Sequence, residues 1–438
     1  MVVLVVLVLL AGVAWWQLPP RALGFAHGRT VSLAAYGGPS PTGVPADLRS
    51  ADLVTRGRYL TAAADCEICH TRPGGQPFAG GLAFETPFGV MYSPNITADA
   101  DTGIGSYSDA DFLHAIHDGV GKGGKRLYPA FPYESYTLLT DEDALAIKAY
   151  LFSLPKVRSA PPSNELLFPF NQRWLMAFWS FFYNPGERFE PREDRSPDWN
   201  RGAYLAEALA HCGDCHTPRN LGQALNNRHK FAGAVAGGWR AFNITPDSET
   251  GIGQWSDDDL FAYLHTGHAS GHGAADGAMG DVFDVSLRGL TVADVRALVA
   301  YVRSVPSVRA RGFAAVNKAP ASEVPESLVA ESDARGRRVF EGACASCHGW
   351  SGESLLSNYA TLVGDRAVND ASAINVAHVV LAGDRGREPQ GLSMPAFGAA
   401  YSDTEIAAVA NYVVGRFGAQ TARLTPNDVA SLREHASE

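Results

Sequence analysis

Cysteine is scarce in this 438-residue chain, and none is left over for a structural disulfide. The six cysteines form three pairs, each followed at once by histidine, as Cys66-Glu-Ile-Cys69-His70, Cys212-Gly-Asp-Cys215-His216 and Cys344-Ala-Ser-Cys347-His348. Long basic runs are also missing and the net charge is −10, so we expect no nucleic-acid partner. No nucleotide loop, hydrolase triad signature or flavin fingerprint occurs, so nothing points to catalysis on a substrate by this chain alone.

The N-terminus has too few apolar residues for an unambiguous membrane span. Val2–Trp16 is apolar apart from Gly12, and a spanning helix needs about 17–25 residues. The run reaches that length if Gln17–Pro19 lie in the interface, where Trp15 and Trp16 are typical anchors. No basic residue precedes the run and no small-residue cleavage site follows it, so an uncleaved anchor over 1–20 is favoured over a cleaved signal.

The sequence contains an internal repeat. Asn95–Phe112 matches Asn243–Leu260 at an offset of 148, and the first two cysteine pairs are offset by 146. We expect each repeat to open on a helix, pass through Gly- and Pro-rich loops and close on a helix with an N-cap residue. The opening helices are predicted at Asp52–Ala64, Trp199–Ala210 and Asp333–Ala343, and the closing helices, capped by Thr140, Thr291 and Ser402, at Asp141–Leu154, Val292–Val305 and Asp403–Phe417.

This layout predicts an all-α chain with three domains in tandem. The segments are an N-terminal anchor or signal at 1–20, domains at 50–160, 196–309 and 329–420, linkers at 161–195 and 310–328, and a polar tail at 421–438. The first linker is rich in aromatic residues. Domain–domain packing is the preferred interpretation of these aromatics, and a docking face is the alternative.

Cys-x-x-Cys-His is the attachment signature of c-type haem. Two thiols three residues apart match the two vinyl groups, and the following histidine supplies an axial ligand to the iron. A redox dithiol does not need that histidine, and a zinc site needs four ligands from two close pairs. We therefore expect three covalent haems c, held by all six cysteines, with His70, His216 and His348 on the iron.

Methionine usually fills the opposite face of the iron, and the chain has five methionines. Met394, in Ser-Met-Pro, and Met279, in a glycine-rich stretch taken as a loop, are the predicted sixth ligands; a core role is the alternative for each. In the first repeat, Phe131 stands in the register of Met279 and cannot bind iron. Met91 is the tentative substitute, and an open iron is the alternative.

Two further features of the first repeat have plainer interpretations. His114 and His117 are additional candidates for the iron, but His117 aligns with His265, and a shared histidine is expected to make structural or propionate hydrogen bonds. Asp99-Ala-Asp101 resembles the start of a calcium loop, yet residue 110 is alanine where a glutamate is required. Asx turns are the preferred interpretation.

The three motifs, the duplicated Asn-Ile-Thr…Thr-Gly-Ile-Gly loops and the Leu-Tyr-Pro-Ala-Phe-Pro-Tyr segment resemble the cytochrome subunit of membrane-bound periplasmic dehydrogenases. The resemblance covers Asp52 to Phe417. It implies class I cytochrome c-like domains at the periplasmic face of the bacterial inner membrane. It also implies a large quinoprotein, flavoprotein or molybdopterin catalytic subunit, a possible small iron–sulfur or accessory subunit, and quinone or another carrier as acceptor. The polar C-terminal end and Phe131 look more like the molybdopterin-linked aldehyde dehydrogenase branch.

The leading hypothesis is thus an electron-transfer subunit of an oxidoreductase complex, which is not catalytic on substrate alone. A free-standing membrane-anchored cytochrome that shuttles electrons to a terminal oxidase is the second. Peroxide reduction at an open first haem is the third, but the residues near Phe131 that could assist it are only Tyr128, Tyr133 and Glu134.

Overall fold

The computed structural model describes residues 18–310, 312–313, 331–384, 393–418 and 421–436, together with Gly12. These residues form two compact units, each assembled from segments that are separate in sequence. The first unit contains Met1–Ala234, Ile244–Pro246 and Gly289–Val308, and the second contains Val235–Asn243, Asp247–Arg288 and Arg309–Glu438. The division therefore runs through the second sequence repeat, whereas the predicted segments separate whole repeats.

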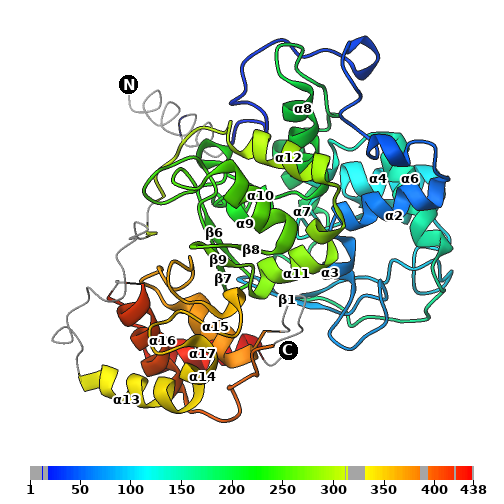
Figure 1. Cartoon of the computed structure of the whole chain (residues 1–438). Helices are drawn as coiled ribbons and strands as arrows, with labels where there is room; N and C mark the ends of the chain where they lie inside the picture. The colour runs from blue at the N-terminus through cyan, green and yellow to red at the C-terminus, as the bar shows by residue number, and fades with distance from the viewer. Residues whose placement is uncertain are drawn as a thin grey trace, which may run out of the picture. The chain divides into compact units, whose positions relative to one another are not determined.

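Helices dominate both units, but short strands accompany them, so the expectation of an all-α chain was incomplete (Figure 1). The first unit contains α2 (Leu53–Ala63), α3 (Cys66–His70), β1 (Ala83–Thr86), β2 (Gly89–Tyr92), α4 (Asp109–Asp118), β3 (Val120–Gly121), β4 (Lys125–Arg126), α5 (Tyr133–Tyr136), α6 (Asp141–Ser153), β5 (Glu165–Leu166), α7 (Leu175–Tyr183), α8 (Pro197–Tyr204), α9 (Gly213–His216) and α12 (Val292–Val302). Its three-stranded sheet has the order β1-β2-β5, with Ala83 opposite Tyr92 and Val90 opposite Glu165.

The second unit has its own helices and two-stranded hairpins. It contains β7 (Trp239–Ala241), α10 (Asp257–Thr266), β8 (His268–Ala269), β9 (Gly273–Ala274), α11 (Gly277–Val285), α13 (Glu331–Val339), α14 (Ala345–His348), α15 (Ile374–Ala382), α16 (Asp403–Phe417) and α17 (Pro426–Ala436), while β6 (Ala234–Ala236) begins at the boundary. Hairpins β3-β4, β6-β7 and β8-β9 follow the same antiparallel plan in the two repeats that carry the Asn-Ile-Thr loop.

The opening and closing helices of each repeat cross at a glycine. A Cβ on Gly57 of α2 would lie 1.9 Å from the carbonyl oxygen of Ala146 on α6. A Cβ on Gly202 of α8 would lie 1.9 Å from the Ala297 oxygen on α12. A Cβ on Gly336 of α13 would lie 2.2 Å from the Ala408 oxygen on α16. Only a residue without a side chain allows two helix backbones to approach this closely. The crossing fixes the end of the opening helix, where each cysteine motif begins.

The first two repeats cap each other's closing helices. The Tyr59 hydroxyl donates to Asp294 at 2.6 Å, and Tyr204 donates to Asp143 at 2.6 Å. Each acceptor lies in the first turn of a closing helix, three residues after its N-cap threonine. Arg201 also donates two bonds to Asp294, of 2.8 and 2.7 Å. The paired residues are related by the repeat, so these bonds join the two repeats reciprocally within the first unit.

A π-helical turn explains why the repeat offset drifts. Gly57 and Gly202 are offset by 145, but the cysteine pairs that follow them are offset by 146. The extra residue lies in Leu205–Leu209, which continues α8 as a π-helix. The opening helix and its motif stay in place in both repeats because the bulge absorbs the insertion.

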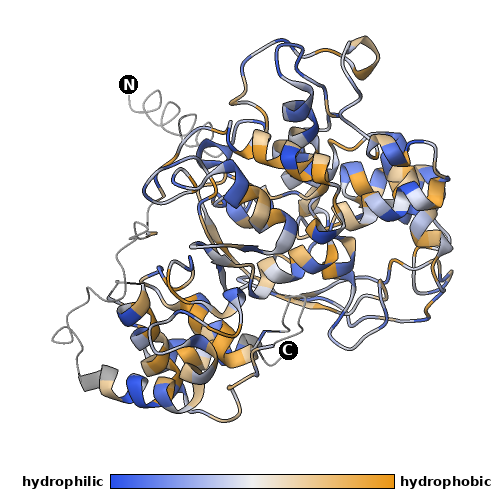
Figure 2. Cartoon of the chain, in the orientation of Figure 1, coloured by the Kyte–Doolittle hydropathy of each residue, from blue (hydrophilic) through white to orange (hydrophobic). Residues whose placement is uncertain are grey.

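The third repeat has a continuous apolar core that extends into the predicted polar tail. Leu424 and Val429 are buried in the same cluster as Ile406, Val414 and Phe417 of α16. Asn411 accepts from the Leu424 amide and donates to its carbonyl, both at 2.9 Å. The segment 421–438 was thus wrongly set apart from the third domain. In Figure 2 the described part of α13 is mainly hydrophilic, whereas α15 and α16 carry the apolar residues.

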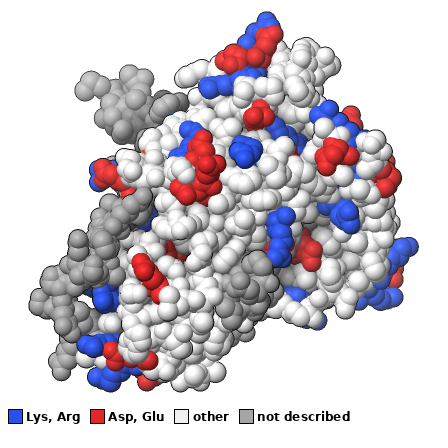
Figure 3. All heavy atoms as spheres, viewed as in Figure 1, with Lys and Arg blue, Asp and Glu red and all other residues white. Residues whose placement is uncertain are grey.

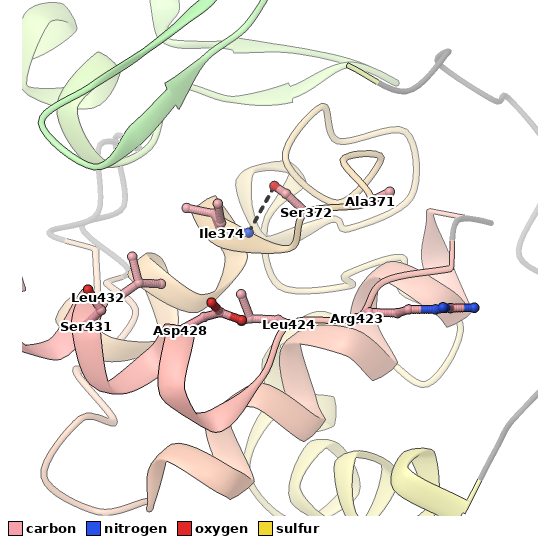
Figure 4. Close-up of a pocket in the computed structure, with 8 residues that line it drawn as sticks. All are labelled: Ala371, Ser372, Ile374, Arg423, Leu424, Asp428, Ser431 and Leu432. Carbon is pink, nitrogen blue, oxygen red and sulfur yellow. Dashed lines mark hydrogen bonds between the residues drawn. The ribbon is translucent and has the colours of Figure 1, made fainter. Parts of the chain in front are cut away.

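A shallow hollow of about 350 Å³ lies between the start of α15 and α17 (Figure 4). Ile374, Leu424 and Leu432 supply its apolar wall, and Asp428 lies at its rim. None of the residues predicted to hold haem lines it. On the face drawn in Figure 3, basic and acidic side chains are interspersed and form no field of one sign.

The predicted N-terminal anchor, apart from Gly12 and the residues from Leu18 on, lies outside the described residues. Among the helices that the structure describes, none combines the length and the apolar composition needed to cross a bilayer.

Candidate functional site

Each Cys-x-x-Cys-His motif occupies a short helix that follows the opening helix of its repeat. The three helices are α3, α9 and α14, and all six cysteines are free thiols. Cys215 and Cys347 are exposed, and the other four cysteines are partly buried. The opening helix therefore positions both thiols of a motif on one helical turn, as the spacing predicts.

The environment of the thiols does not suit a redox dithiol. Burial, with Asp65 as the next cause, raises the pKa of both Cys66 and Cys69 to about 12. Burial likewise raises the pKa of Cys344 to about 11. A catalytic Cys-x-x-Cys pair instead has a lowered pKa, because its thiolate is the nucleophile. Among the described residues, no group of three or more His, Cys, Asp or Glu could hold a metal ion in the manner of a zinc site.

The motif histidines are oriented by backbone carbonyls. His70 Nδ1 lies 2.8 Å from the oxygen of Pro94, and His348 Nδ1 lies 2.7 Å from the oxygen of Ala360. A carbonyl can only accept, so Nδ1 carries the proton and Nε2 keeps its lone pair. Burial lowers the pKa of both histidines and favours this neutral form. These imidazoles fit the role of axial ligand to a haem iron.

His216 occupies the same position in the second repeat. Its carbonyl accepts from the Gly233 amide at 2.8 Å, as the His70 carbonyl accepts from the Gly80 amide at 2.7 Å. The corresponding loops then return past the motif in both repeats.

The duplicated Asn-Ile-Thr loop holds the carbonyl that orients His70. Asn95 follows Pro94 directly, and its side-chain amide donates to the carbonyl of Val157, beyond the closing helix, at 2.7 Å. Its Oδ1 accepts from the amide and the hydroxyl of Thr97. In the same loop, Asp99 Oδ1 accepts from the amide and hydroxyl of Thr102, both at 2.7 Å. The Asx-turn interpretation is confirmed, and this loop braces the histidine.

The three candidate methionines lie on different kinds of element. Met394 forms an antiparallel bridge with Asp384, and its partly buried side chain packs against the core of the third repeat. Met279 is the third residue of α11, so the glycine-rich loop predicted there is a helix. Met91 lies in β2 opposite Phe84, three residues before the Pro94 that holds His70. Iron ligation by each remains a prediction.

The first two repeats share a register over the eight residues after Gly119 and Gly267, and the pairing of Phe131 with Met279 beyond it stays a prediction. Gly119 and Gly267 both end a helix in the left-handed conformation, and each carbonyl accepts from the residue eight positions later. A Cβ on Gly119 would meet the ring of Tyr133, and one on Gly267 would meet the ring of Phe283. Since these aromatics lie 14 and 16 residues on, two extra residues enter the second repeat after the shared eight.

His117 makes structural hydrogen bonds within the first unit. Its buried Nδ1 accepts from Arg188 at 2.5 Å, and Asn184 donates to its carbonyl at 2.8 Å. Burial first and Arg188 second lower the pKa of His117 to about 4. His114 is exposed and pairs with Asp118 at 2.8 Å. The expectation that the shared histidine makes structural hydrogen bonds is confirmed for His117.

The sequence did not reveal an acidic cluster beside the first two motifs. Asp65 is buried and raises the pKa of thiols in both motifs, so both lie within its electrostatic reach. Burial and then Asp214 raise the pKa of Glu134 to about 8, while Arg219 opposes the shift. Asp65 and Asp214 lie before and inside a Cys-x-x-Cys motif, where any residue is allowed, so the sequence alone did not indicate that they lie near Glu134.

Comparison with known proteins places these features in context. The family profile described as Cytochrome c matches residues 54–155, 200–306 and 334–416. A nicotinate dehydrogenase subunit of Pseudomonas putida is 42% identical over 375 residues, which cover 84% of this chain but 31% of that longer protein. The fructose dehydrogenase cytochrome subunit of Gluconobacter japonicus is 38% identical over 401 residues, 87% of this chain and 82% of the relative. The gluconate 2-dehydrogenase cytochrome c subunit of Pantoea cypripedii is 39% identical over 401 residues, 87% and 90% respectively.

Proposed function

The chain belongs to the cytochrome c family, among the cytochrome c subunits of dehydrogenase complexes, and from that premise we propose that it carries electrons by means of three covalently bound haems. The donor is a periplasmic dehydrogenase catalytic subunit, and the acceptor is membrane quinone or another respiratory carrier. Haem supplies the one-electron chemistry that the protein side chains lack. A free-standing shuttle to a terminal oxidase is less well supported, because the relatives named above are subunits of dehydrogenases.

The residues of this chain would hold each haem in the same way. The two thiols of a motif would hold a haem through thioether bonds to its two vinyl groups. The histidine that follows would bind iron through Nε2, since Nδ1 donates to a carbonyl in His70 and His348. Met279 and Met394 would complete the second and third sites. Met91, or no methionine, would complete the first.

One observation carries the proposal. All three motifs stand at the end of an opening helix that crosses its closing helix at a glycine, at Gly57, Gly202 and Gly336. A redox dithiol or a zinc ligand pair would not require the same helix crossing three times. Three equal sites within one chain suit the relay of electrons over a distance that one haem could not cover.

The donor and the location are part of the same proposal. Covalent haem attachment takes place outside the cytoplasm, and the apolar run Val2–Trp16 suits an anchor at the periplasmic face of the inner membrane. The donor subunit would be a molybdopterin, quinoprotein or flavoprotein dehydrogenase.

Denaturing mass spectrometry and co-purification test the proposal. The chain produced in cells with working haem-attachment machinery should show the protein mass plus three haem masses. Affinity purification from the native host should also recover a large dehydrogenase subunit. A mass with two haems or fewer would remove the three-haem assignment, and recovery of a terminal oxidase in place of a dehydrogenase would favour the shuttle.

A further inference from the structure

The helix α7 presents an apolar stripe to solvent. Trp174, Phe178, Phe181 and Phe182 follow the spacing i, i+4, i+7 and i+8, which places them on one side of a helix. Their exposed fractions are 61%, 59%, 80% and 55%. In a globular protein, a stripe with this spacing normally faces the core, so its exposure here calls for a partner.

The opposite side of α7 is firmly packed, so the exposed stripe belongs to a fixed helix. The indole of Trp179 donates to the Gly222 carbonyl at 2.7 Å and meets the ring of Tyr133 edge-on at 5.6 Å. Tyr183 packs beside Trp179 at 5.3 Å, against Gly222. The sequence alone allowed either packing or docking for these aromatics. In the structure one side of α7 is packed, and the other side is exposed and available for docking.

The preceding segment extends the apolar surface. Leu167 and Phe168 are 64% and 80% exposed. Phe170 packs against Phe88 with ring centroids 4.2 Å apart and is itself exposed. We define the aromatic face as the seven exposed side chains of this region: Leu167, Phe168, Phe170, Trp174, Phe178, Phe181 and Phe182. Exposed apolar side chains gathered in one segment in this way mark an interaction site.

Cationic side chains adjoin the N-terminal end of this face. Arg173, which directly precedes Trp174, donates to the Arg126 carbonyl at 2.9 Å and lies over the Tyr128 ring at 4.6 Å. Lys125 directly precedes Arg126 in β4 and is exposed. Aromatic residues beside Lys and Arg are the composition of helices that lie in the interface of anionic membranes.

Leu18 and Pro20 are bonded to the same loop that α7 packs against. Asn227 donates to the Pro20 carbonyl at 3.0 Å, and Arg228 donates to the Leu18 carbonyl at 3.1 Å. These residues belong to the loop after α9 that also contains Gly222, on which Trp179 rests. Leu18, Pro20 and α7 thus contact one loop, and in the sequence the apolar run Val2–Trp16 comes shortly before Leu18.

We propose that the aromatic face lies on the surface of a bilayer that contains anionic lipids, with α7 as an interfacial helix. At 1.5 Å per residue α7 is roughly 14 Å long, under half of the about 30 Å hydrocarbon core, so it lies in the interface and does not span. This inference rests on the membrane location given under the proposed function. The cations and the shared loop favour lipid over a protein partner.

Photocrosslinking in native membranes tests the occupant directly. The full haem-loaded chain with Phe181→p-benzoylphenylalanine is irradiated in membranes of the producing cells, and the adduct is identified by mass spectrometry. We expect phospholipid adducts in several-fold greater yield than from Leu53→p-benzoylphenylalanine, a position 48% exposed on α2. An adduct with a dehydrogenase subunit or with a second copy of this chain would overturn the proposal, as would a yield equal to that at position 53.

Vesicle binding provides the second measurement. The triple variant Phe178→Ser, Phe181→Ser, Phe182→Ser should lose several-fold in affinity for phosphatidylglycerol–phosphatidylcholine vesicles, while Leu53→Ser with Val54→Ser should bind like the parent chain. An unchanged haem content and visible spectrum would show that the variant is folded. Equal binding by all three proteins would overturn the proposal. Neither measurement depends on electron transfer. The two experiments therefore test the membrane contact even if the proposed electron donor or acceptor is wrong.

Discussion

Among single residues, His117 should give the chain a pH-dependent stability. Its imidazole is buried and faces the Arg188 guanidinium, with Asp141 at 3.7 Å as the nearest carboxylate and His114 and Asp118 on its own helix. The folded-state pKa is about 4, against 6.5 for the free side chain. Between these values the unfolded chain binds a proton that the folded chain does not, so stability is lost as pH falls from 6.5 towards 4.

At about 1.4 kcal/mol per pKa unit, the loss from His117 amounts to at most about 3 kcal/mol. Urea unfolding of the haem-loaded chain between pH 7 and pH 4.5 should show this slope. The variant His117→Asn, which keeps an acceptor for Arg188, should flatten it, while His114→Asn at the exposed position should not. A slope unchanged in His117→Asn would assign the acid sensitivity to other groups.

Met279 and Met394 should each raise the potential of one haem. A thioether ligand stabilises the reduced iron, so Met279→Ala and Met394→Ala should each lower one potential by on the order of 0.1 V, within the about 0.8 V that axial ligands span. Spectroelectrochemical titration measures this. Met176→Ala is the matched control, since Met176 lies on α7, outside the three repeats. If either variant titrates like the parent, that methionine is a packing residue.

The motif predicts which histidine belongs to each site but not what orients its ring. His70 and His348 follow from the motif alone. Their carbonyl partners, Pro94 and Ala360, lie 24 and 12 residues away and share no motif, because the fold supplies a carbonyl and any residue can carry one. Met91 shows the same limit, since its place in β2 depends on pairing that reaches to β5.

Among the helices, a glycine at which two helices cross should not tolerate replacement by a larger residue. In Gly202→Ala the new Cβ would lie 1.9 Å from the Ala297 oxygen and 2.7 Å from the Tyr301 Cβ, so α8 and α12 must move apart. Overpacking of this kind costs about 1–3 kcal/mol, and a backbone clash belongs at the upper end. Thermal unfolding of the haem-loaded chain should show a lower midpoint.

Gly289→Ala is the control for the crossing. Gly289 is exposed and lies in the same unit, and a Cβ added there would meet nothing within 4 Å. The thermal unfolding midpoint of Gly289→Ala should equal that of the parent chain within experimental error. Equal midpoints for Gly202→Ala and Gly289→Ala would mean that the helices are not in contact as described.

Helices were predictable where caps and apolar spacing coincide. Thr140 and Thr291 accept from the third residue of their helices, so the predicted and observed starts agree, and Asp403–Phe417 agrees at both ends. The hairpins were missed because strands of two to four residues are too short for an alternating pattern. Met279 was assigned to a loop because Gly277 and Gly280 flank it, and α17 was missed because so few of its residues are buried.

In the molecule as a whole, the third repeat lacks the tyrosine and the buried aspartate that join the first two repeats. Tyr59 and Tyr204 lie two residues after the crossing glycine, but Arg338 holds that place in the third repeat. Asp143 and Asp294 are buried, whereas Glu405 at the equivalent position caps its own helix through Ser402. The reciprocal tyrosine bonds therefore belong to the first two repeats alone, and the third repeat must be joined by other contacts.

Those contacts lie within the second unit and involve the β7 region of the second repeat. Arg240 pairs with buried Asp370 at 2.6 Å, and its backbone exchanges bonds of 2.9 and 3.0 Å with Asn375. Trp239 stacks on His378 with ring centroids 4.5 Å apart. This set of bonds is independent of the covalent connection through residues 310–328, which composition predicts to be an extended linker.

We therefore expect the chain to survive cleavage of that linker as one particle. Brief trypsin treatment should cut after Lys318, because the surrounding Ala- and Pro-rich segment is predicted to be extended. Haem-stained gels under denaturing conditions should then show an N-terminal fragment with two haems and a C-terminal fragment with one, while native size exclusion should give a single peak at the parent position. Arg240→Ala combined with Asn375→Ala removes the buried pair and the backbone exchange, so the nicked double variant should separate into two peaks. Separation of the nicked parent chain would show that the linker, and not the contacts around Arg240, holds the third repeat in place.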